Sequence, residues 1–343
     1  MPSPCWSNTY LLILNADPGK LRLRCAHLRH QATVLEPNHQ SGFRSFVTNS
    51  PKSSVVRDSG AEISLSSPPP EPRHLWARLT ERLSSWRADW REIIDTPRRQ
   101  TGFCPFRGSD ALQNEAVFEA FAIALISANT RWDSIARIRS DLHEPFQNFS
   151  PTRYAALTDS AIREIVLPWF RERRAASARL DKRLLSLKRT AAVLGGSDGY
   201  RSARHFLDAA YAAAAGSPER LAMLIGGSPG WKLPGFGIPL AAEALRLLGF
   251  DLCKPDRHVL RAMGSWRLVH FARWDRKGEF TAPQARPSEL LDVMLGVRRL
   301  AEANGLGVSH ANSVIWLAGA ASGPHVTNLG FERMAALAKT QGR

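Results

Sequence analysis

A glycine turn between two apolar segments is the first candidate for chemistry. It lies in the stretch WKLPGFGIPLAAEALRLLG, residues 231–249, and contains Gly235 and Gly237. Glycines allow positive φ angles and leave no Cβ in the way of a neighbour. The helix that follows would begin near Ile238, with its first N–H groups pointing outward beside the positive end of the helix dipole. Such a turn can bind a phosphate through its backbone, although an ordinary helix–helix turn with glycines for packing fits the same residues.

A single aspartate follows this turn. Asp256 stands after Pro255, 19 residues past Gly237, at the head of the segment RHVLRAMG. Aspartate at that place is typical of a helix N-cap, which is the more common role. It is also placed to direct a carboxylate at whatever the turn binds. The two roles are compatible, and both are expectations for Asp256.

Composition favours an anionic partner. The chain has 343 residues and a formal net charge of +15, which favours DNA, RNA or an acidic membrane surface. The longest nearly apolar run, residues 117–128, contains Glu119 and is too short to span a bilayer, so no membrane partner is expected. The four cysteines are widely scattered, which predicts reduced thiols and neither a disulfide framework nor a metal site.

The chain divides into an atypical beginning and a helical remainder. Residues 1–72 are rich in Ser, Pro, Asn and Gly and are expected to be mostly disordered. From His74 onward, apolar residues recur every three to four positions, which predicts about ten helices and an all-α fold. The first of them is expected over 75–96, the next two over 114–128 and 132–142. A strongly basic helix is expected over 170–190, with its cations on several faces.

Three motifs together resemble the helix-hairpin-helix (HhH-GPD) DNA glycosylase superfamily, the relatives of endonuclease III, 8-oxoguanine glycosylase and alkyladenine glycosylase. The hairpin LPGFG, residues 233–237, resembles the family's L-P-G-hydrophobic-G. PDRHV, residues 255–259, resembles the V-D-x-H motif that follows about twenty residues later. Upstream, ALISANTRWDSI resembles the helix end LLSAQTTD. The motifs come in the family's order, and the resemblance covers about residues 113–320.

The resemblance implies a two-part fold and a hydrolytic reaction. Two helical subdomains would flank a cleft within residues 73–343: a helical barrel with the hairpin over 113–248, and a second part made of 75–96 and 250–343. The implied activity is hydrolysis of the N-glycosidic bond of a damaged, modified or mispaired base in double-stranded DNA. Asp256 would stabilise the positive charge that develops on the sugar and orient the attacking water.

Two departures from the family pattern limit that chemistry. Pro239 stands where some members carry a catalytic lysine, so the resemblance implies a monofunctional glycosylase without lyase activity. The last cysteine is Cys253, so the family's iron–sulfur cluster is not expected. No other cofactor is expected, apart from room for a monovalent cation at the hairpin.

The resemblance also implies roles for residues around the two motifs. Asn129 matches the glutamine of SAQ and would fill the gap left by a flipped base, although a helix C-cap explains it equally well. Trp132 and Trp169 are candidates for stacking on that base, with burial in the core as the alternative. The remaining expected DNA contacts lie in or beside the motifs: Lys232, Leu233, Gly235, Phe236, Gly237, Arg257 and Arg261.

Other function classes stay open at this point. A non-catalytic helix-hairpin-helix DNA-binding protein would use the same hairpin, whereas a two-metal nuclease lacks the carboxylate cluster it would need. The sequence does not choose between alkylated, oxidised and mispaired bases. We expect a monomer associated with the nucleoid in the cytoplasm of a bacterium, or nuclear or organellar in a eukaryote.

Overall fold

The computed structural model describes residues 71–86, 88–92, 94–95, 106, 108, 112–130, 132–197, 199–275 and 282–319. All of them belong to one compact unit, Ser67–Arg343. The expected disordered tail over residues 1–72 lies outside the described residues, except for its last two positions. None of the helices in the described ranges is long and apolar enough to cross a membrane.

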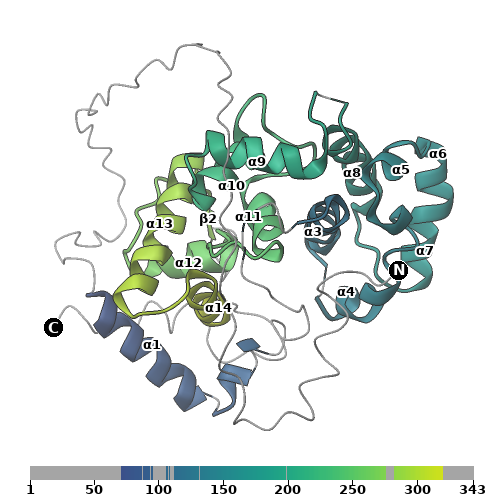
Figure 1. Ribbon diagram of the computed structural model, residues 1–343. Helices are drawn as coiled ribbons and strands as arrows, with labels where there is room; N and C mark the ends of the chain where they lie inside the picture. The colour runs from purple at the N-terminus through teal and green to yellow at the C-terminus, as the bar shows by residue number, and fades with distance from the viewer. Residues whose placement is uncertain are drawn as a thin grey trace, which may run out of the picture. The chain divides into compact units, whose positions relative to one another are not determined.

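The described part of the chain is helical, as predicted (Figure 1). Its α-helices are α1 (Pro72–Trp86), α3 (Asn114–Ser127), α4 (Trp132–Ile138), α5 (Pro151–Ala155), α6 (Asp159–Ala161), α7 (Leu167–Glu172), α8 (Leu180–Leu194), α9 (Ala203–Ala213), α10 (Pro218–Gly227), α11 (Ile238–Leu247), α12 (Arg257–Ser265), α13 (Pro287–Ala303) and α14 (Val308–Gly319). Shorter helical turns are η2 (Arg139–Asp141), η3 (Gln147–Phe149) and the π-turn η4 (Ile162–Val166). Two strands of two residues each, β1 (Trp274–Asp275) and β2 (Ala282–Pro283), pair antiparallel, with Trp274 opposite Pro283, and leave the all-α class unchanged.

Helix α3 lies at the centre of the fold. Nine of its 14 residues are buried, on nearly every side of the helix. A helix that is apolar all round must be enclosed by other elements. Helix α3 accordingly contacts α8, α9 and α11, and Figure 1 shows it beside α8 and α11. The end of α3 and the start of α11, which carry the Asn129 and hairpin motifs, are therefore fixed to one core.

The first helix is shorter than its sequence pattern indicates. Helix α1 buries Leu75, Leu79 and Leu83 and ends at Trp86, and residues 88 and 89 form a turn instead of continuing it. Trp90 then turns into the core, with its indole Nε1–H donating a hydrogen bond to Ser84 Oγ at 3.0 Å. The apolar spacing continues past the helix end because the next segment also faces the core.

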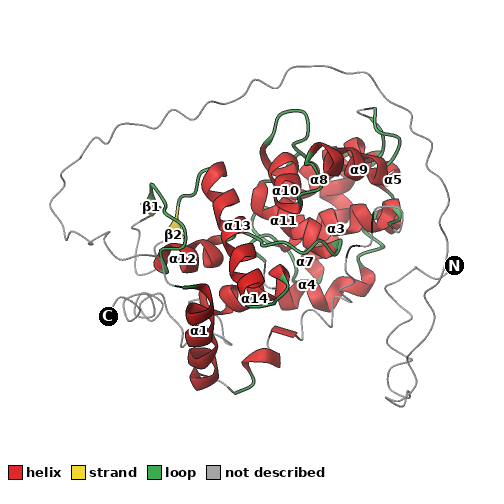
Figure 2. Cartoon of the chain, turned by 60° about the vertical axis from the view of Figure 1, so that its left-hand side comes forward, coloured by secondary structure: helices red, strands yellow, loops and turns green. Residues whose placement is uncertain are grey.

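The helices after residue 250 pack together with α1. Helix α12 contacts α13 and α14, α13 contacts α14, and α1 contacts α13. Figure 2 shows α12, α13 and α14 beside one another, with α1 next to them. Helix α13 also contacts α10, the first helix of the hairpin. The predicted division into two subdomains stays a prediction.

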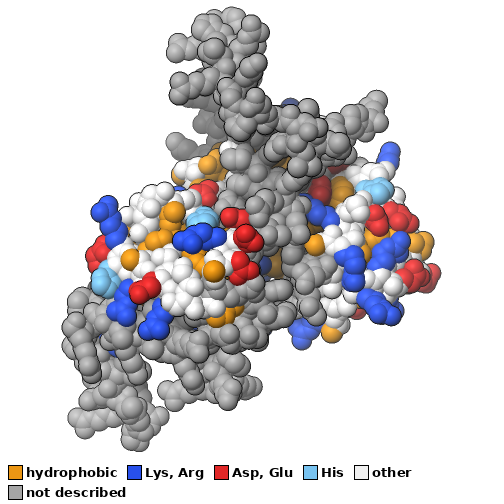
Figure 3. Space-filling view, turned by 90° about the horizontal axis from the view of Figure 1, so that it is seen from below, with side chains coloured by type: hydrophobic (Ala, Val, Ile, Leu, Met, Phe, Trp, Pro, Cys, Tyr) orange, Lys and Arg blue, Asp and Glu red, His pale blue; other side chains and the backbone are white. Residues whose placement is uncertain are grey.

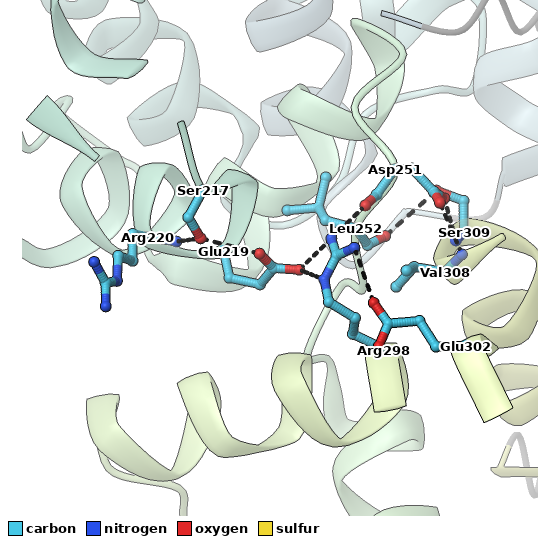
Figure 4. A network of polar contacts seen from close by, with 9 residues as sticks. All are labelled: Ser217, Glu219, Arg220, Asp251, Leu252, Arg298, Glu302, Val308 and Ser309. Atoms are coloured by element: carbon cyan, nitrogen blue, oxygen red, sulfur yellow. Dashed lines mark hydrogen bonds and ion pairs between the residues drawn. The ribbon is translucent and has the colours of Figure 1, made fainter. Parts of the chain in front are cut away.

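A buried ion pair joins α10 to α13 and to the loop after α11 (Figure 4). Glu219 accepts a hydrogen bond from Arg298 Nε at 2.6 Å, and Ser217 Oγ donates to its other oxygen at 3.1 Å. Arg298 Nη2 also donates to the carbonyl of Asp251 at 3.0 Å. One guanidinium therefore connects the hairpin helix with the loop that leads to Asp256.

Candidate nucleic-acid interface and carboxylate site

The hairpin between α10 and α11 is anchored by buried apolar side chains. Leu233 and Phe236 are both buried, and the Leu233 N–H donates to the Ile225 carbonyl at 3.0 Å. The Phe236 ring packs edge-on against Phe121 of α3, with 5.2 Å between ring centroids. The expected DNA contacts of Leu233 and Phe236 are therefore limited to their backbone atoms, because both side chains belong to the core.

The exposed positions of the hairpin are a lysine and the two glycines. Lys232, Gly235 and Gly237 are exposed between the buried positions. The amide N–H groups of Gly235, Gly237 and Ile238 donate no hydrogen bond to any described residue. Unpaired amides at the start of a helix form an anion-binding site together with the helix dipole. The backbone thus offers the site that the glycine turn predicts.

The two reasons expected for glycine, a positive φ and room for a neighbour, apply differently at the two positions. Gly235 has φ +81°, and a Cβ there would lie 2.7 Å from the Cβ of Ser186 in α8. Gly237 has an ordinary φ of −104°, and a Cβ there would meet only Pro239 Cδ, at 3.9 Å. Gly235 is required by the fold, whereas the space beside Gly237 is open to a ligand.

Helix α8 supports the hairpin, a role that the sequence analysis missed. Besides the contact of Ser186 with Gly235, the buried Thr190 donates a hydrogen bond from Oγ1 to the Pro234 carbonyl at 2.9 Å. The sequence offered one signal for this contact: Thr190 is a polar residue on the apolar side of a basic amphipathic helix. Its partner lies 44 residues away, and no local pattern identifies it.

Two neighbouring glycines in α10 provide a matched test of the hairpin's close packing. A Cβ on Gly226 would collide with the backbone of Ile238, whereas one on Gly227 would be in ordinary contact, 3.7 Å from Ile238 Cδ1. We expect Gly226→Ala to lower the free energy of unfolding by about 1–3 kcal/mol, because the two helices must separate. Gly227→Ala is expected to change it by less than about 1 kcal/mol. Urea denaturation of both variants checks this, and equal stabilities would show that the close approach is not needed.

Asp256 is the N-cap of α12, as expected. Its Oδ1 accepts hydrogen bonds from the backbone N–H groups of His258 and Val259, at 3.0 and 3.2 Å. The side chain is half-buried, and Oδ2 accepts no hydrogen bond from the described residues. One carboxylate oxygen is therefore used by the fold, and the other is available to a ligand.

The first turn of α14 holds the loop that carries Asp256. The Asp251 carboxylate accepts hydrogen bonds from the N–H groups of Ser309 and Val308, at 2.7 and 2.9 Å. In return, Asn312 Oδ1 accepts from the Lys254 N–H at 3.0 Å. Asn312 is buried, so this bond forms away from water. The loop is tied to α14 at both ends, which restricts where the Asp256 carboxylate can lie.

Of the two arginines expected to meet phosphates in α12, one is inside the protein. Arg261 is only 4% exposed, and its Nη1 donates to the Gly319 carbonyl at the end of α14, at 3.0 Å. The expected phosphate contact of Arg261 is therefore wrong, because the guanidinium binds the negative end of a helix dipole. Arg257 is exposed, and its Nε donates to His258 Nε2 at 3.2 Å.

His258 is held as a neutral imidazole. Its Nδ1 lies 3.2 Å from the Gly319 carbonyl and must carry the proton to donate there, which leaves Nε2 to accept from Arg257. Burial lowers the pKa of His258 below 6.5, and the charges of Arg257 and Arg261 act in the same direction, although the Asp256 carboxylate opposes them.

This lowered pKa predicts a loss of stability in acid. Below pH 6.5 the unfolded chain protonates His258 while the folded chain does not, so the free energy of unfolding falls as the pH falls. We expect His258→Gln to remove this contribution and so to lose less stability than the parent between about pH 7.5 and 5.5. Urea denaturation at the two pH values measures the difference. Identical losses in the two proteins would contradict the assigned protonation state.

Asn129 takes the backbone conformation of a residue that ends a helix. It follows α3 with φ +52°, which is the left-handed region that asparagine tolerates at this place. Its side chain is exposed. The C-cap itself is Ala128, and Asn129 is the left-handed residue that follows it, so Asn129 helps to end the helix. Its role in filling a gap in DNA stays a prediction. Trp132 begins α4, and its side chain lies outside the described residues.

Trp169 is part of the packed core and not of an open pocket. It is 8% exposed, and its indole Nε1–H donates to Glu144 Oε2 at 2.9 Å. The Arg173 guanidinium covers the ring, 4.0 Å from its centroid, and Phe170 packs edge-on against it. The expected stacking of a base on Trp169 is not supported, because these neighbours occupy the ring.

A second carboxylate joins α11 to the Asp256 loop. Glu243 lies 3.6 Å from Lys254 Nζ and 3.2 Å from Arg246 Nη1. Burial raises the pKa of Glu243, but the charges of Lys254 and Arg246 outweigh it and hold the pKa below its usual value. Lys254 is the amine nearest to Asp256 in sequence, and its Nζ is directed at Glu243 of α11 by this ion pair.

One face of the protein carries charges of both signs. On the face shown in Figure 3, Lys and Arg side chains stand among Asp and Glu side chains and form no uniform basic area. Among the described residues, no group of three or more His, Cys, Asp or Glu side chains could hold a metal ion.

Comparison with known proteins adds one similarity. The chain is 18% identical to the 8-oxoguanine DNA glycosylase of Thermotoga maritima in its crystal structure, with a TM-score of 0.47 over 71% of this chain and 96% of that one. No family model matches the chain, and no curated protein matches it.

Proposed function

We propose that this protein is a DNA glycosylase that hydrolyses the N-glycosidic bond of a damaged, modified or mispaired base. The observation that supports this most directly is the state of Asp256. One oxygen caps α12 and fixes the carboxylate in place, while the other accepts nothing from the described residues. The loop that carries it is held by α14 on one side and joined to the hairpin helix by Lys254 and Glu243 on the other.

The proposed reaction needs one ionised carboxylate at the sugar. Breaking the bond to the base builds positive charge on the deoxyribose, and a nearby carboxylate lowers the free energy of that state. Asp256 Oδ2 would supply this charge and orient the water that attacks the sugar. The base must first leave the stack, which costs a few kcal/mol and less for a damaged or mispaired base.

The same proposal assigns DNA contacts to the backbone of the hairpin. The unpaired amides of Gly235, Gly237 and Ile238 would bind a phosphate of double-stranded DNA, with Lys232 and Arg257 as exposed cations nearby. Asn129 would fill the gap left by the flipped base. The hairpin carbonyls of Leu233, Pro234 and Gly237 each accept hydrogen bonds from the protein and keep acceptor capacity, so the proposal still allows a monovalent cation there.

We further propose that the enzyme lacks lyase activity and acts as a monomer. Lyase chemistry needs an uncharged amine that can attack the sugar, and Pro239 occupies the first turn of the hairpin helix. The nearby Lys254 is ion-paired with Glu243. The expected product is therefore an intact strand with an abasic site.

A panel of lesion-bearing duplexes tests the proposal. Duplexes that carry an alkylated purine, an oxidised base, or uracil or thymine opposite guanine are incubated with the protein and resolved with and without alkali. We expect at least one lesion to give a strand break that appears only after alkali. Breaks without alkali would contradict the absence of lyase activity. Binding to DNA without base release from any duplex would favour a non-catalytic helix-hairpin-helix protein.

A further inference from the structure

A basic cavity lies at the end of α3, away from the Asp256 loop in sequence. Its volume is about 370 Å³. It lies between Asn129, just after α3, the segment before α8 and the first two turns of α8. Three cations and no carboxylate are among the lining residues, which are Asn129, Ser177, Ala178, Arg179, Lys182, Arg183 and Ser186.

One of the three cations builds the cavity. Arg183 Nη1 donates to the Ala128 carbonyl at the end of α3 and to Ser177 Oγ, the latter at 2.7 Å. The guanidinium thus neutralises the negative end of the α3 dipole and ties two walls together. Burial lowers the pKa of Arg183, and the positive charge of Arg179 lowers it further.

The other two cations are not ion-paired within the described part of the chain. Arg179 and Lys182 are exposed, and neither forms an ion pair with a described residue. Cations gathered in a hollow reinforce one another's field, because the surrounding protein screens them less than water does. An anion with several oxygen acceptors would relieve the repulsion between them and could also accept from the serine hydroxyls.

The cavity is continuous with the hairpin through α8. Arg179, Lys182 and Ser186 follow one another at helical spacing and lie on one face of α8. Ser186 lines the cavity and also lies against Gly235, the exposed glycine of the hairpin. Arg189 extends this face by one turn, with its Nη2 donating to Ser186 Oγ at 3.2 Å. A row of cations therefore leads from the hairpin amides to the cavity.

We propose that this cavity binds a phosphodiester of the DNA strand held by the hairpin, with Arg179 and Lys182 as its cationic ligands. The identification of the anion as DNA rests on the proposed function, whereas the anion site itself rests on the cavity and its unpaired cations. A phosphate bound here would lie along the same face of α8 as the phosphate at the hairpin amides, nearer to the start of the helix. The two contacts would fix the direction of the strand across α8.

The salt dependence of DNA binding tests this inference. The variant Arg179→Ser/Lys182→Ser is compared with Arg78→Ser/Arg82→Ser, which removes the same charge from α1, a helix that packs on α13. The dissociation constant for an undamaged duplex is measured at several KCl concentrations, after thermal melting has shown that both variants fold. Each lost phosphate contact should reduce the slope of log Kd against log salt by about 0.9.

We expect the α8 variant to bind about tenfold more weakly at low salt, with a reduced slope on two unrelated sequences, and the α1 variant to match the parent. Equal slopes in the two variants would overturn the inference, as would an α8 variant that matches the parent. The measurement needs no base release. A parent protein that binds DNA but releases no base would therefore refute the proposed function and leave the cavity inference to be decided by the slopes.

Discussion

Asp256→Asn is expected to abolish base release while leaving the protein folded and bound to DNA. Asparagine caps helices about as well as aspartate, so its side-chain oxygen can still accept from His258 N and Val259 N. What disappears is the negative charge on the oxygen that faces away from the helix. Losing such an electrostatic group at a developing charge lowers a catalytic rate by about 10²–10³-fold.

Asp256→Ala separates the two roles of this residue. It removes the charge and the cap together and should cost about 1 kcal/mol of stability in addition to activity. Single-turnover base release, DNA affinity and urea denaturation are measured for both variants. The assignment requires equal loss of activity in the two and a stability loss in the alanine variant alone. Base release by Asp256→Asn at the parent's rate would remove Asp256 from the mechanism.

Arg298→Ala is expected to have the largest effect on stability. Glu219 has a side chain only 3% exposed, and Arg298 is its charged partner. Without Arg298 the carboxylate keeps only the hydrogen bond from Ser217 and stays buried as a nearly uncompensated charge. Breaking a buried ion pair by removing one partner costs about 3–5 kcal/mol. The loop at Asp251 also loses the hydrogen bond to its carbonyl.

Two further variants show that this cost comes from the unpaired charge. Arg299→Ala removes the neighbouring arginine, which is exposed, and should change the free energy of unfolding by less than about 0.5 kcal/mol. Adding Glu219→Gln to Arg298→Ala removes the buried charge and should recover most of the loss. Urea denaturation measures all three. A similar loss for Arg298→Ala and Arg299→Ala, or no recovery by Glu219→Gln, would contradict the explanation.

The sequence predicted local features well where one segment determines them. The helical class follows from apolar spacing, and the cap role of Asp256 follows from its position after Pro255 at the head of α12. The turn at residues 233–237 was also identified from its glycines. Each of these features depends on residues within a few positions of one another. The local sequence pattern is therefore enough to predict it.

Residue roles that depend on distant partners were missed or wrong. Arg261 looked like a surface cation, but the end of α14, 58 residues later, covers it and accepts its hydrogen bond. Trp169 looked available for stacking, but its side chain is buried and its indole donates a hydrogen bond to Glu144, 25 residues earlier in the chain. Burial depends on which elements pack together, and a residue's type and spacing do not contain that information.

By itself, the sequence determined that this chain folds into helices joined at a glycine hairpin, because side-chain periodicity and turn residues act locally. Only the tertiary structure decided what each glycine and cation of that hairpin is for. Gly235 cannot carry a Cβ because Ser186 of α8 lies beside it, whereas Gly237 faces open space. Arg183 is used by the end of α3, while Arg179 and Lys182 line the same cavity and form no ion pair with a described residue. These differences arise from contacts between segments that are far apart in the chain. Such contacts form, and stabilise the protein, only when the helices pack together.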